Sequence, residues 1–307
     1  MRLRGQHKCN TRCRFSNQTS FVCPVSFAQR KPVVHLFQHD ATGTRLLLID
    51  AAQLDDAEFA QLSDLQGGRS LYADLGGEAS RVVPWIAPCD ESGGLEKCIF
   101  NRDGKPNHYL SLLDSDTSQS TVENHLQQLR IMVGPNGARY FFRFADTRAL
   151  ITVYESVSAD ARRALIGPIT EWHYWSRSGA KNSLCTMTAL ASATLPLALT
   201  PASMRKIIQA SRPDQLMSEI REIRPDTLEP LSGSEAHEIA KSVCNYLRTH
   251  RISENSARLA IGIVAFKTKG RVLHDEEFER QIKATNLARH PDSILDWPDN
   301  TSCQVPA

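Results

Sequence analysis

The sequence of 307 residues has no run of about 20 apolar residues, the length that a helix needs to span a bilayer. The longest candidate, residues 189–199, is short and contains serine, threonine and proline. A secretory signal is also missing, because Phe21 to Phe27 is interrupted by Cys23-Pro24 and no apolar segment follows the N-terminal charges. We therefore expect a soluble protein that does not contact a membrane and stays in the cytoplasm.

The common catalytic motifs are missing too. The chain has no G-x-S-x-G elbow and no glycine–lysine loop of the kind that cradles phosphates. His237-Glu238 begins like the helix of a zinc protease, but Lys241 stands where the second histidine is needed. His173, between two aromatic residues, is expected to be packed rather than catalytic. The sequence thus predicts a protein that is not an enzyme and has no small-molecule substrate, with an unrecognised catalytic site as an alternative.

Metal and disulfide signals are weak. The eight cysteines are scattered over a long chain, which is unlike a small disulfide scaffold, and free thiols are expected. Cys9, Cys13 and Cys23 match no standard zinc spacing. Asp114 and Asp116 do not complete a calcium loop. We expect no metal and no cofactor.

Charge is unevenly distributed although the formal net charge is only +2. Residues 1–45 contain eight arginine and lysine residues and one acidic residue, Asp40, so the remaining chain is mildly acidic. The basic arm is expected to be a poorly ordered leader, since polar terminal segments without a buried face stay loose. A regulatory protein that binds nucleic acid through this arm is an alternative, but an acidic body makes nucleic acid an unexpected partner.

After the arm, hydrophobic patterns predict alternating strands and helices. Expected strands lie at 45–50, 70–73, 81–86, 109–113, 140–144 and 169–175, and the proline of the third suggests a sheet edge. Expected helices lie at 55–65, 120–129, 149–157 and 159–165, with a capping box at Ser120–Glu123. Gly134-Pro135-Asn136-Gly137 predicts a turn into the aromatic strand.

Residues 178–182 are expected to form a linker, beyond which the pattern is helical. Thr200-Pro201, Pro213-Asp214, Ser234, Ser253 and Asp275 are expected to begin successive helices. The predicted class is α+β, with an N-terminal mixed sheet lobe that carries helices and an all-helical C-terminal lobe. The predicted divisions are a leader at 1–44, an α+β domain at 45–178, a helical lobe at 195–290 and a tail at 291–307.

The segment Phe141 to Arg148 is the one place where a strand pattern carries a tight cluster of opposite charges. Alternation puts Phe142 and Phe144 on one face and Arg143 on the other. An arginine held among aromatic residues needs a carboxylate or carbonyl partner, because an unpaired buried charge costs several kcal/mol. Two interpretations remain open at this point, a structural ion pair that closes the strand end and a recognition surface.

Five segments in order resemble the adaptor chaperones of type VI secretion effectors. They are Leu47-Leu48-Ile49-Asp50-Ala51-Ala52, Ser70-Leu71-Tyr72, Val83-Pro84-Trp85-Ile86, Phe142-Arg143-Phe144-Ala145-Asp146-Thr147-Arg148 and Gly167-Pro168-Ile169. The fourth is similar to the family's F-R-F-Y/W-D-P-R signature. Ala145 replaces its aromatic residue and Thr147 replaces its proline, so partner choice is expected to differ. The resemblance covers about residues 45–176.

The resemblance implies a binding protein that holds the N-terminal part of a toxic effector and helps load it onto the secretion spike (VgrG). Such a task needs aromatic anchors beside a few oriented charges. On this basis eight residues are expected to contact the partner, namely Arg143, Asp146, Arg148, Phe142, Phe144, Tyr72, Trp85 and Trp172. Trp175 is expected near the same sheet.

Overall fold

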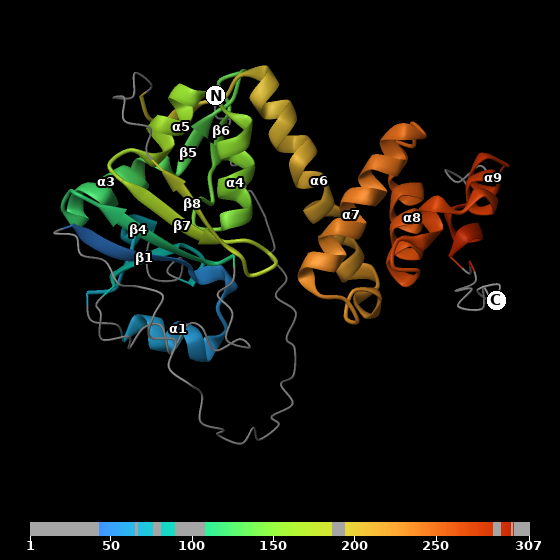
Figure 1. Ribbon diagram of the computed structural model, residues 1–307, viewed down its shortest axis with the longest axis horizontal. Coiled ribbons are helices and arrows are strands. Elements are labelled where there is room, and N and C mark those ends of the chain that lie inside the picture. Colours follow the sequence, from blue (N-terminus) through green and yellow to red (C-terminus); the bar gives the residue numbers. More distant parts are fainter. Residues whose placement is uncertain are drawn as a thin grey trace, which may run out of the picture. The chain divides into compact units, whose positions relative to one another are not determined.

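The computed structural model describes residues 43–64, 67–75, 81–89, 108–185, 194–284, 290–295 and 297. By its internal contacts the chain divides into residues 1–39 and residues 40–307. Residues 1–42 of the basic arm, which include Cys9, Cys13 and Cys23, and the C-terminal tail beyond Trp297 lie outside the described residues. The second unit is α+β, with strands in its first part and helices in its second, as the sequence predicted (Figure 1).

A six-stranded antiparallel sheet forms the centre of the first part, in the order β2-β3-β1-β4-β7-β8. The strands are β1 (Thr44–Asp50), β2 (Arg69–Ser70), β3 (Pro84–Pro88), β4 (Leu110–Ser115), β7 (Glu171–Trp175) and β8 (Lys181–Cys185). Both β1 and β4 have buried side chains on their two faces, which is typical of strands covered on both sides. These two strands therefore lie in the interior of the sheet.

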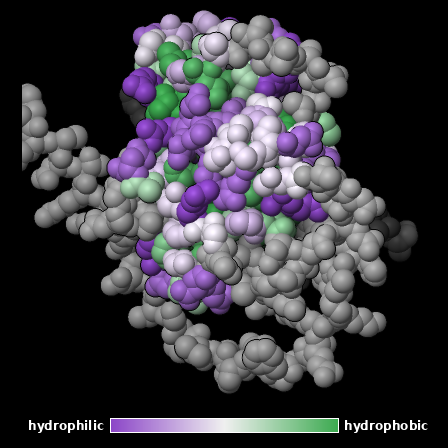
Figure 2. Space-filling view, turned by 90° about the vertical axis from the view of Figure 1, so that its left-hand side faces the viewer, coloured by the Kyte–Doolittle hydropathy of each residue, from purple (hydrophilic) through white to green (hydrophobic). Residues whose placement is uncertain are grey.

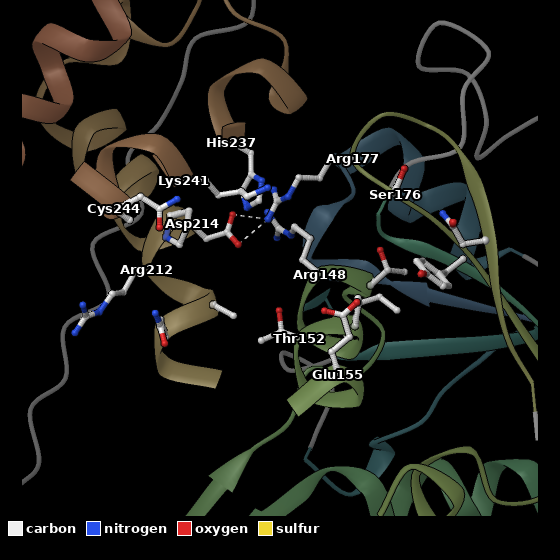
Figure 3. Close-up of a pocket in the computed structure, with 18 of the residues that line it drawn as sticks. Arg148, Thr152, Glu155, Ser176, Arg177, Arg212, Asp214, His237, Lys241 and Cys244 are labelled. Atoms are coloured by element: carbon white, nitrogen blue, oxygen red, sulfur yellow. Dashed lines mark hydrogen bonds and ion pairs between the residues drawn. The ribbon is translucent and has the colours of Figure 1, made fainter. Parts of the chain in front are cut away.

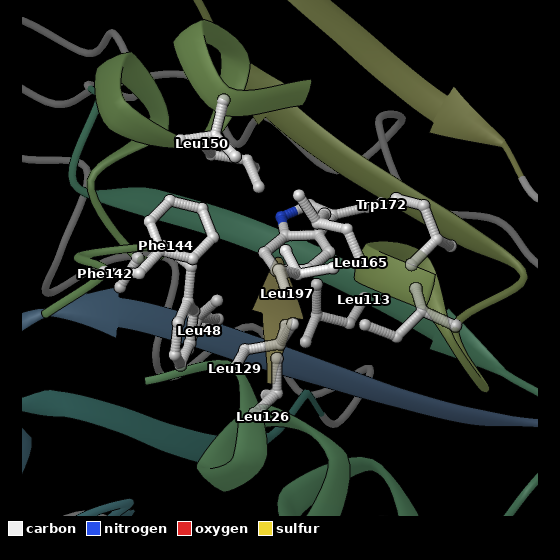
Figure 4. Packing of buried hydrophobic residues seen from close by; sticks show 14 of the residues in the cluster. Leu48, Leu113, Leu126, Leu129, Phe142, Phe144, Leu150, Leu165, Trp172 and Leu197 are labelled. Carbon is white, nitrogen blue, oxygen red and sulfur yellow. The ribbon is translucent and has the colours of Figure 1, made fainter. Parts of the chain in front are cut away.

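Helices cover both faces of this sheet. The helix α1 (Asp56–Ser63) lies on one side, while α4 (Thr147–Ser156) and α5 (Ala159–Ile166) lie on the other (Figure 1). The helix α3 (Gln119–Leu129) packs with them through Val122, Leu126 and Leu129, all fully buried and spaced at helical intervals. Figure 4 shows these leucines meeting strand residues in one cluster.

A second, three-stranded sheet has the order β6-β5-β9. It comprises β5 (Ile131–Val133), β6 (Arg139–Phe141) and β9 (Leu197–Ala198), and β9 runs parallel to β5. The turn predicted at 134–137 joins β5 to β6, and Gly137 occupies the positive-φ conformation that glycine permits. Leu197 is buried in the same cluster as the leucines of α3, so the two sheets share one core.

The second part of the unit is helical. It consists of α6 (Pro201–Ile223), α7 (Gly233–Thr249), α8 (Asn255–Lys267) and α9 (Glu276–Ala284), with 3-10 turns between and after them. Neighbouring helices pack around their own apolar cluster, which includes Leu216, Ile220, Val243, Ile261 and Phe278. Thr200 caps α6 and Asp275 caps the start of α9, as the sequence predicted. Among the described residues no helix combines the length and apolarity needed to cross a membrane.

The expected linker at 178–182 is wrong. Residues 176–180 form the turn of a hairpin, in which Ser176 and Ala180 are joined by a backbone hydrogen bond, and β8 follows directly. The sheet residues continue to β9, so strands extend past the predicted end of the α+β domain. The prediction failed because β8 is an edge strand whose sequence is polar, with only Leu184 buried.

Four smaller expectations also differ from the structure. Pro213 lies inside one continuous helix, α6, and does not begin a new one. The cap of α3 is Ser118 instead of the expected box at Ser120–Glu123, because Glu123 turns inward to bind Arg69.

The strand β3 is not at the sheet edge, since the two-residue β2 pairs with its outer side. The aromatic strand ends at Phe141, so Phe142 to Phe144 lie beyond it.

Candidate functional site

Four of the eight residues expected to contact a partner are core residues. Tyr72, Phe142, Phe144 and Trp172 each have at most 2% of their surface exposed. Phe144 makes edge-to-face contacts with the other three, at ring-centroid distances of 6.0 to 6.4 Å. Figure 4 shows Phe142, Phe144 and Trp172 in this cluster. They therefore do not line an open groove, and any effect they have on binding passes through the fold.

Trp85 belongs to a different environment. It is half-buried and packs edge-to-face on Phe59 of α1 at 5.8 Å, on the opposite face of the sheet from Trp172. The exposed aromatic residues of this region are instead Tyr140 and Phe141 on β6, at 40% and 52% exposure. On the face shown in Figure 2, hydrophobic side chains of the described residues form small patches among hydrophilic ones.

Arg143 is paired with a carboxylate, as the sequence predicted, although it lies beyond the strand. Its Nη2 donates to Oδ2 of Asp50 at 2.7 Å, and the carboxylate is only 3% exposed while the arginine side chain is 46% exposed. Burial raises the pKa of Asp50, and the nearby charge of Arg143 opposes that rise. The guanidinium thus covers a buried acid with one side and faces solvent with the other.

Asp146 and Arg148 form the second charged pair at the start of α4. Asp146 caps the helix by accepting a hydrogen bond from the backbone N–H of Arg148. Its two carboxylate oxygens also accept from Nε and Nη2 of Arg148, at 2.8 and 2.6 Å. Burial opposes ionisation, but these hydrogen bonds and the charge of Arg148 hold the pKa of Asp146 below its usual value. The pair is therefore ionised and joined by three hydrogen bonds.

Arg148 also lines a pocket of about 530 Å³, a volume within the range of ligand sites. One wall comes from α4 and the hairpin of β7 and β8, and the opposite wall comes from α6 and α7 (Figure 3). The first wall includes Thr152, Glu155, Tyr174, Ser176 and Arg177. The second includes Arg212, Asp214, His237, Lys241 and Arg248. The pocket therefore joins sheet and helical parts of one unit.

An ion pair crosses the pocket between these walls. Nη2 of Arg177 donates to both carboxylate oxygens of Asp214, at 2.5 and 2.6 Å (Figure 3). The two side chains are 19% and 35% exposed. Burial and, to a smaller extent, the charge of Arg148 lower the pKa of Arg177, while the carboxylate of Asp214 acts in the opposite direction. The guanidinium is still charged at neutral pH. This pair fixes α6 against the hairpin.

Two titratable groups on α7 have pKa values shifted by burial. Burial raises the pKa of the Cys244 thiol, which keeps it protonated and weakly nucleophilic. Burial and the charge of Arg177 lower the pKa of His237, so the imidazole is neutral at physiological pH. Cys185 and Cys244 form no disulfide, as expected.

A separate cluster places Asp114, Glu171 and His173 within 4.8 Å of one another on β4 and β7. Oxygen and imidazole ligands of this kind can bind a divalent cation. However, Nε and Nη2 of Arg45 already donate to both oxygens of Asp114, at 2.6 and 3.1 Å. A cation would have to displace this guanidinium. Burial acts to raise the pKa of Asp114, but the hydrogen bonds from His173 and Arg45 outweigh it and hold the pKa well below its usual value. We interpret the cluster as an ion-pair network.

Sequence reasoning singled out Arg148 and Trp175 but did not connect them with the other residues of the pocket. Arg177, Asp214, His237 and Arg248 come from three segments that are distant in sequence, and none belongs to a local motif. Only the helical spacing of His237, Lys241, Cys244 and Arg248 could have shown that these residues share one face of α7.

The comparisons with known proteins are sparse. No curated protein and no solved structure matches the chain. Residues 46–164 match the model of a family described as Domain of unknown function (DUF4123), which is associated with type VI secretion effector adaptors. The matched segment contains Arg143, Asp146 and Arg148 and ends before β7, so it includes one wall of the pocket only in part.

Proposed function

We propose that this protein is a non-enzymatic adaptor chaperone that binds the N-terminal region of a type VI secretion effector. In this role it promotes loading of the effector onto the VgrG spike. The observation that carries the proposal is the match of residues 46–164 to DUF4123, together with the paired signature residues inside that segment. A pocket whose walls carry oriented charges and aromatic side chains supplies a surface for a protein segment.

The test is co-expression of the tagged full chain with the product of the neighbouring downstream gene, followed by affinity capture and size exclusion. The proposal predicts a stable complex that forms only when the N-terminal region of the effector is present. The spike protein is added as a third component in a second experiment, where the effector is expected to associate with it more completely when the adaptor was co-expressed. Soluble, folded protein that captures neither effector nor spike would contradict the proposal.

Arg143 gives a sharper test of the recognition surface, because it is the most exposed of the predicted contact residues in the charged signature. Arg143→Lys keeps a positive charge beside Asp50, whereas Arg143→Ala removes it. If Arg143 binds the effector, both variants weaken capture because a lysine cannot reproduce the planar fork of donors. Unchanged capture by a folded Arg143→Ala protein would show that the residue serves the fold alone.

A further inference from the structure

We infer that the pocket between α4 and the helices α6 and α7 binds an acidic segment of the partner protein. Arg212 and Arg248 are the residues that would hold its carboxylates. The inference rests on the proposed function, since it assigns the chemistry of the segment that an adaptor would bind. It goes further in naming which part of this chain selects the partner.

The charge of the pocket favours an anionic occupant. Its lining has five cationic side chains against two carboxylates. Three of the cations already have partners, because Arg148 binds Asp146, Arg177 binds Asp214 and Lys241 binds Glu238. A ligand would gain little by competing for these pairs.

Arg212 and Arg248 are the cations that remain. Both are exposed, and within the described part of the chain neither is paired with a carboxylate. Arg248 only donates to the amide oxygen of Asn245, at 3.2 Å. Arginine side chains bind carboxylates through two parallel hydrogen bonds, so these residues offer two strong sites on one wall.

The remaining lining favours a peptide over a small anion. Ile151, Tyr174, Trp175, Ala210 and Pro213 place apolar surface beside the charges. An occupant that matches both properties combines carboxylates with apolar side chains, as an acidic amphipathic segment does. Glu155 on the α4 wall repels carboxylates on that side of the pocket. The carboxylates of the bound segment would therefore face Arg212 and Arg248 on the opposite wall.

The position of the two arginines also bears on selectivity. Arg212 lies on α6 and Arg248 on α7, while the segment that matches DUF4123 ends at residue 164. The α4 residues that line the pocket belong to the matched segment and the two arginines do not. The helical part therefore supplies the side chains that distinguish an acidic partner segment from a neutral or basic one.

The test measures binding of the full chain to a fluorescein-labelled peptide built from glutamate and leucine, by fluorescence anisotropy. The comparison peptide has glutamine in place of every glutamate. We expect the glutamate peptide to bind more tightly by about tenfold or more, with an advantage that shrinks as salt is added. Arg212→Glu and Arg248→Glu should each remove most of that advantage.

Arg221→Glu is the matched control, because Arg221 is an exposed arginine on α6 that does not line the pocket. Like Arg248, it lies in the last turn of its helix, so the helix-dipole effect of the substitution is similar in the two variants. It should bind the glutamate peptide as the unaltered protein does. Thermal melting establishes that all three variants are folded.

Three results would overturn the inference. They are equal binding of the glutamate and glutamine peptides, equal loss of binding in Arg221→Glu, and binding of citrate or phosphate with no binding of either peptide. Capture of the effector separates this inference from the proposed function. If Arg212→Glu and Arg248→Glu capture the effector normally, the inference fails and the adaptor role stands. If the peptide binds but no effector is captured, the site stands and the adaptor role fails.

Discussion

Arg143 donates a hydrogen bond to Asp50 at 2.7 Å and so joins the segment after β6 to the end of β1, 93 positions away. The acid is almost fully buried at the point where the central strand ends. Both interpretations of the charged signature are therefore compatible with its geometry. The pair closes a strand end, and the outer side of the guanidinium remains accessible.

Replacing Arg143 by alanine should destabilise the protein by about 2–4 kcal/mol at neutral pH, because it leaves a buried carboxylate without its charged partner. Burial already raises the pKa of Asp50, and loss of Arg143 raises it further. The folded variant then binds a proton at Asp50 more readily than its unfolded chain, so its stability deficit relative to the unaltered protein shrinks as pH falls. Urea unfolding at several pH values measures this change.

Arg139→Ala is the control for that experiment, since Arg139 is an exposed arginine on the adjacent strand. Its substitution should change stability by less than about 0.5 kcal/mol at every pH. A deficit in Arg143→Ala that grows as the medium becomes more acidic would contradict the assignment of Asp50 as the buried partner.

Asp214→Asn should weaken the attachment of α6 to the hairpin of β7 and β8. The amide cannot balance the charge of Arg177, which is mostly buried, and we expect a loss of about 1–3 kcal/mol. Asp226→Asn provides the comparison, because Asp226 is an exposed aspartate in the turn after α6. Equal melting temperatures for the two variants would show that the ion pair contributes nothing to stability.

Phe144 and Phe141 should differ sharply although they are three positions apart. Phe144→Ala removes a fully buried ring that contacts Tyr72, Phe142 and Trp172, and should cost about 3–5 kcal/mol. Phe141 is half exposed at the edge of β6, so Phe141→Ala should cost well under half as much. Chemical denaturation of both variants measures the difference. Similar losses would mean that Phe144 is not part of the core described above.

Stability should also fall in mild acid because of His108. Burial and the charge of Arg148 lower its pKa from 6.5 to about 4, while Asp146 acts in the opposite direction. The unfolded chain therefore binds a proton between these pH values and the folded chain does not. Stability is complete above pH 6.5 and is lost as pH falls toward 4, by up to about 3 kcal/mol. His108→Gln should remove this pH dependence. An unchanged dependence of stability on pH in that variant would show that His108 is not its cause.

The sequence predicted elements whose own residues carry the signal. The run from Leu46 to Ile49 indicated a buried strand, and the spacing of Val122, Leu126 and Leu129 indicated a helix face. Both predictions are confirmed, because apolar periodicity reflects the side on which a segment meets the core. Segments stabilised by their neighbours were missed. The polar β8 is a strand only because it pairs with β7.

In the candidate site, too, the sequence predicted what is local and missed what depends on distant segments. Arg143, Asp146 and Arg148 are close in sequence, and their opposite charges are enough to indicate a paired cluster from the sequence alone. The pocket forms because α6 continues through Pro213. The sequence predicted a new helix at this proline, because proline prefers the first turn of a helix. Arg212, Asp214 and Arg248 consequently had no predicted connection with Arg148.

The central proposal is that this protein binds the N-terminal region of an effector. The most direct measurement is size exclusion with mass determination after co-expression of the full chain with the neighbouring effector, intact or lacking that region. The account predicts one complex containing both proteins with the intact effector, and separate elution with the truncated one. Separate elution in both cases, from folded protein, would contradict the account, as would a complex that persists without the N-terminal region.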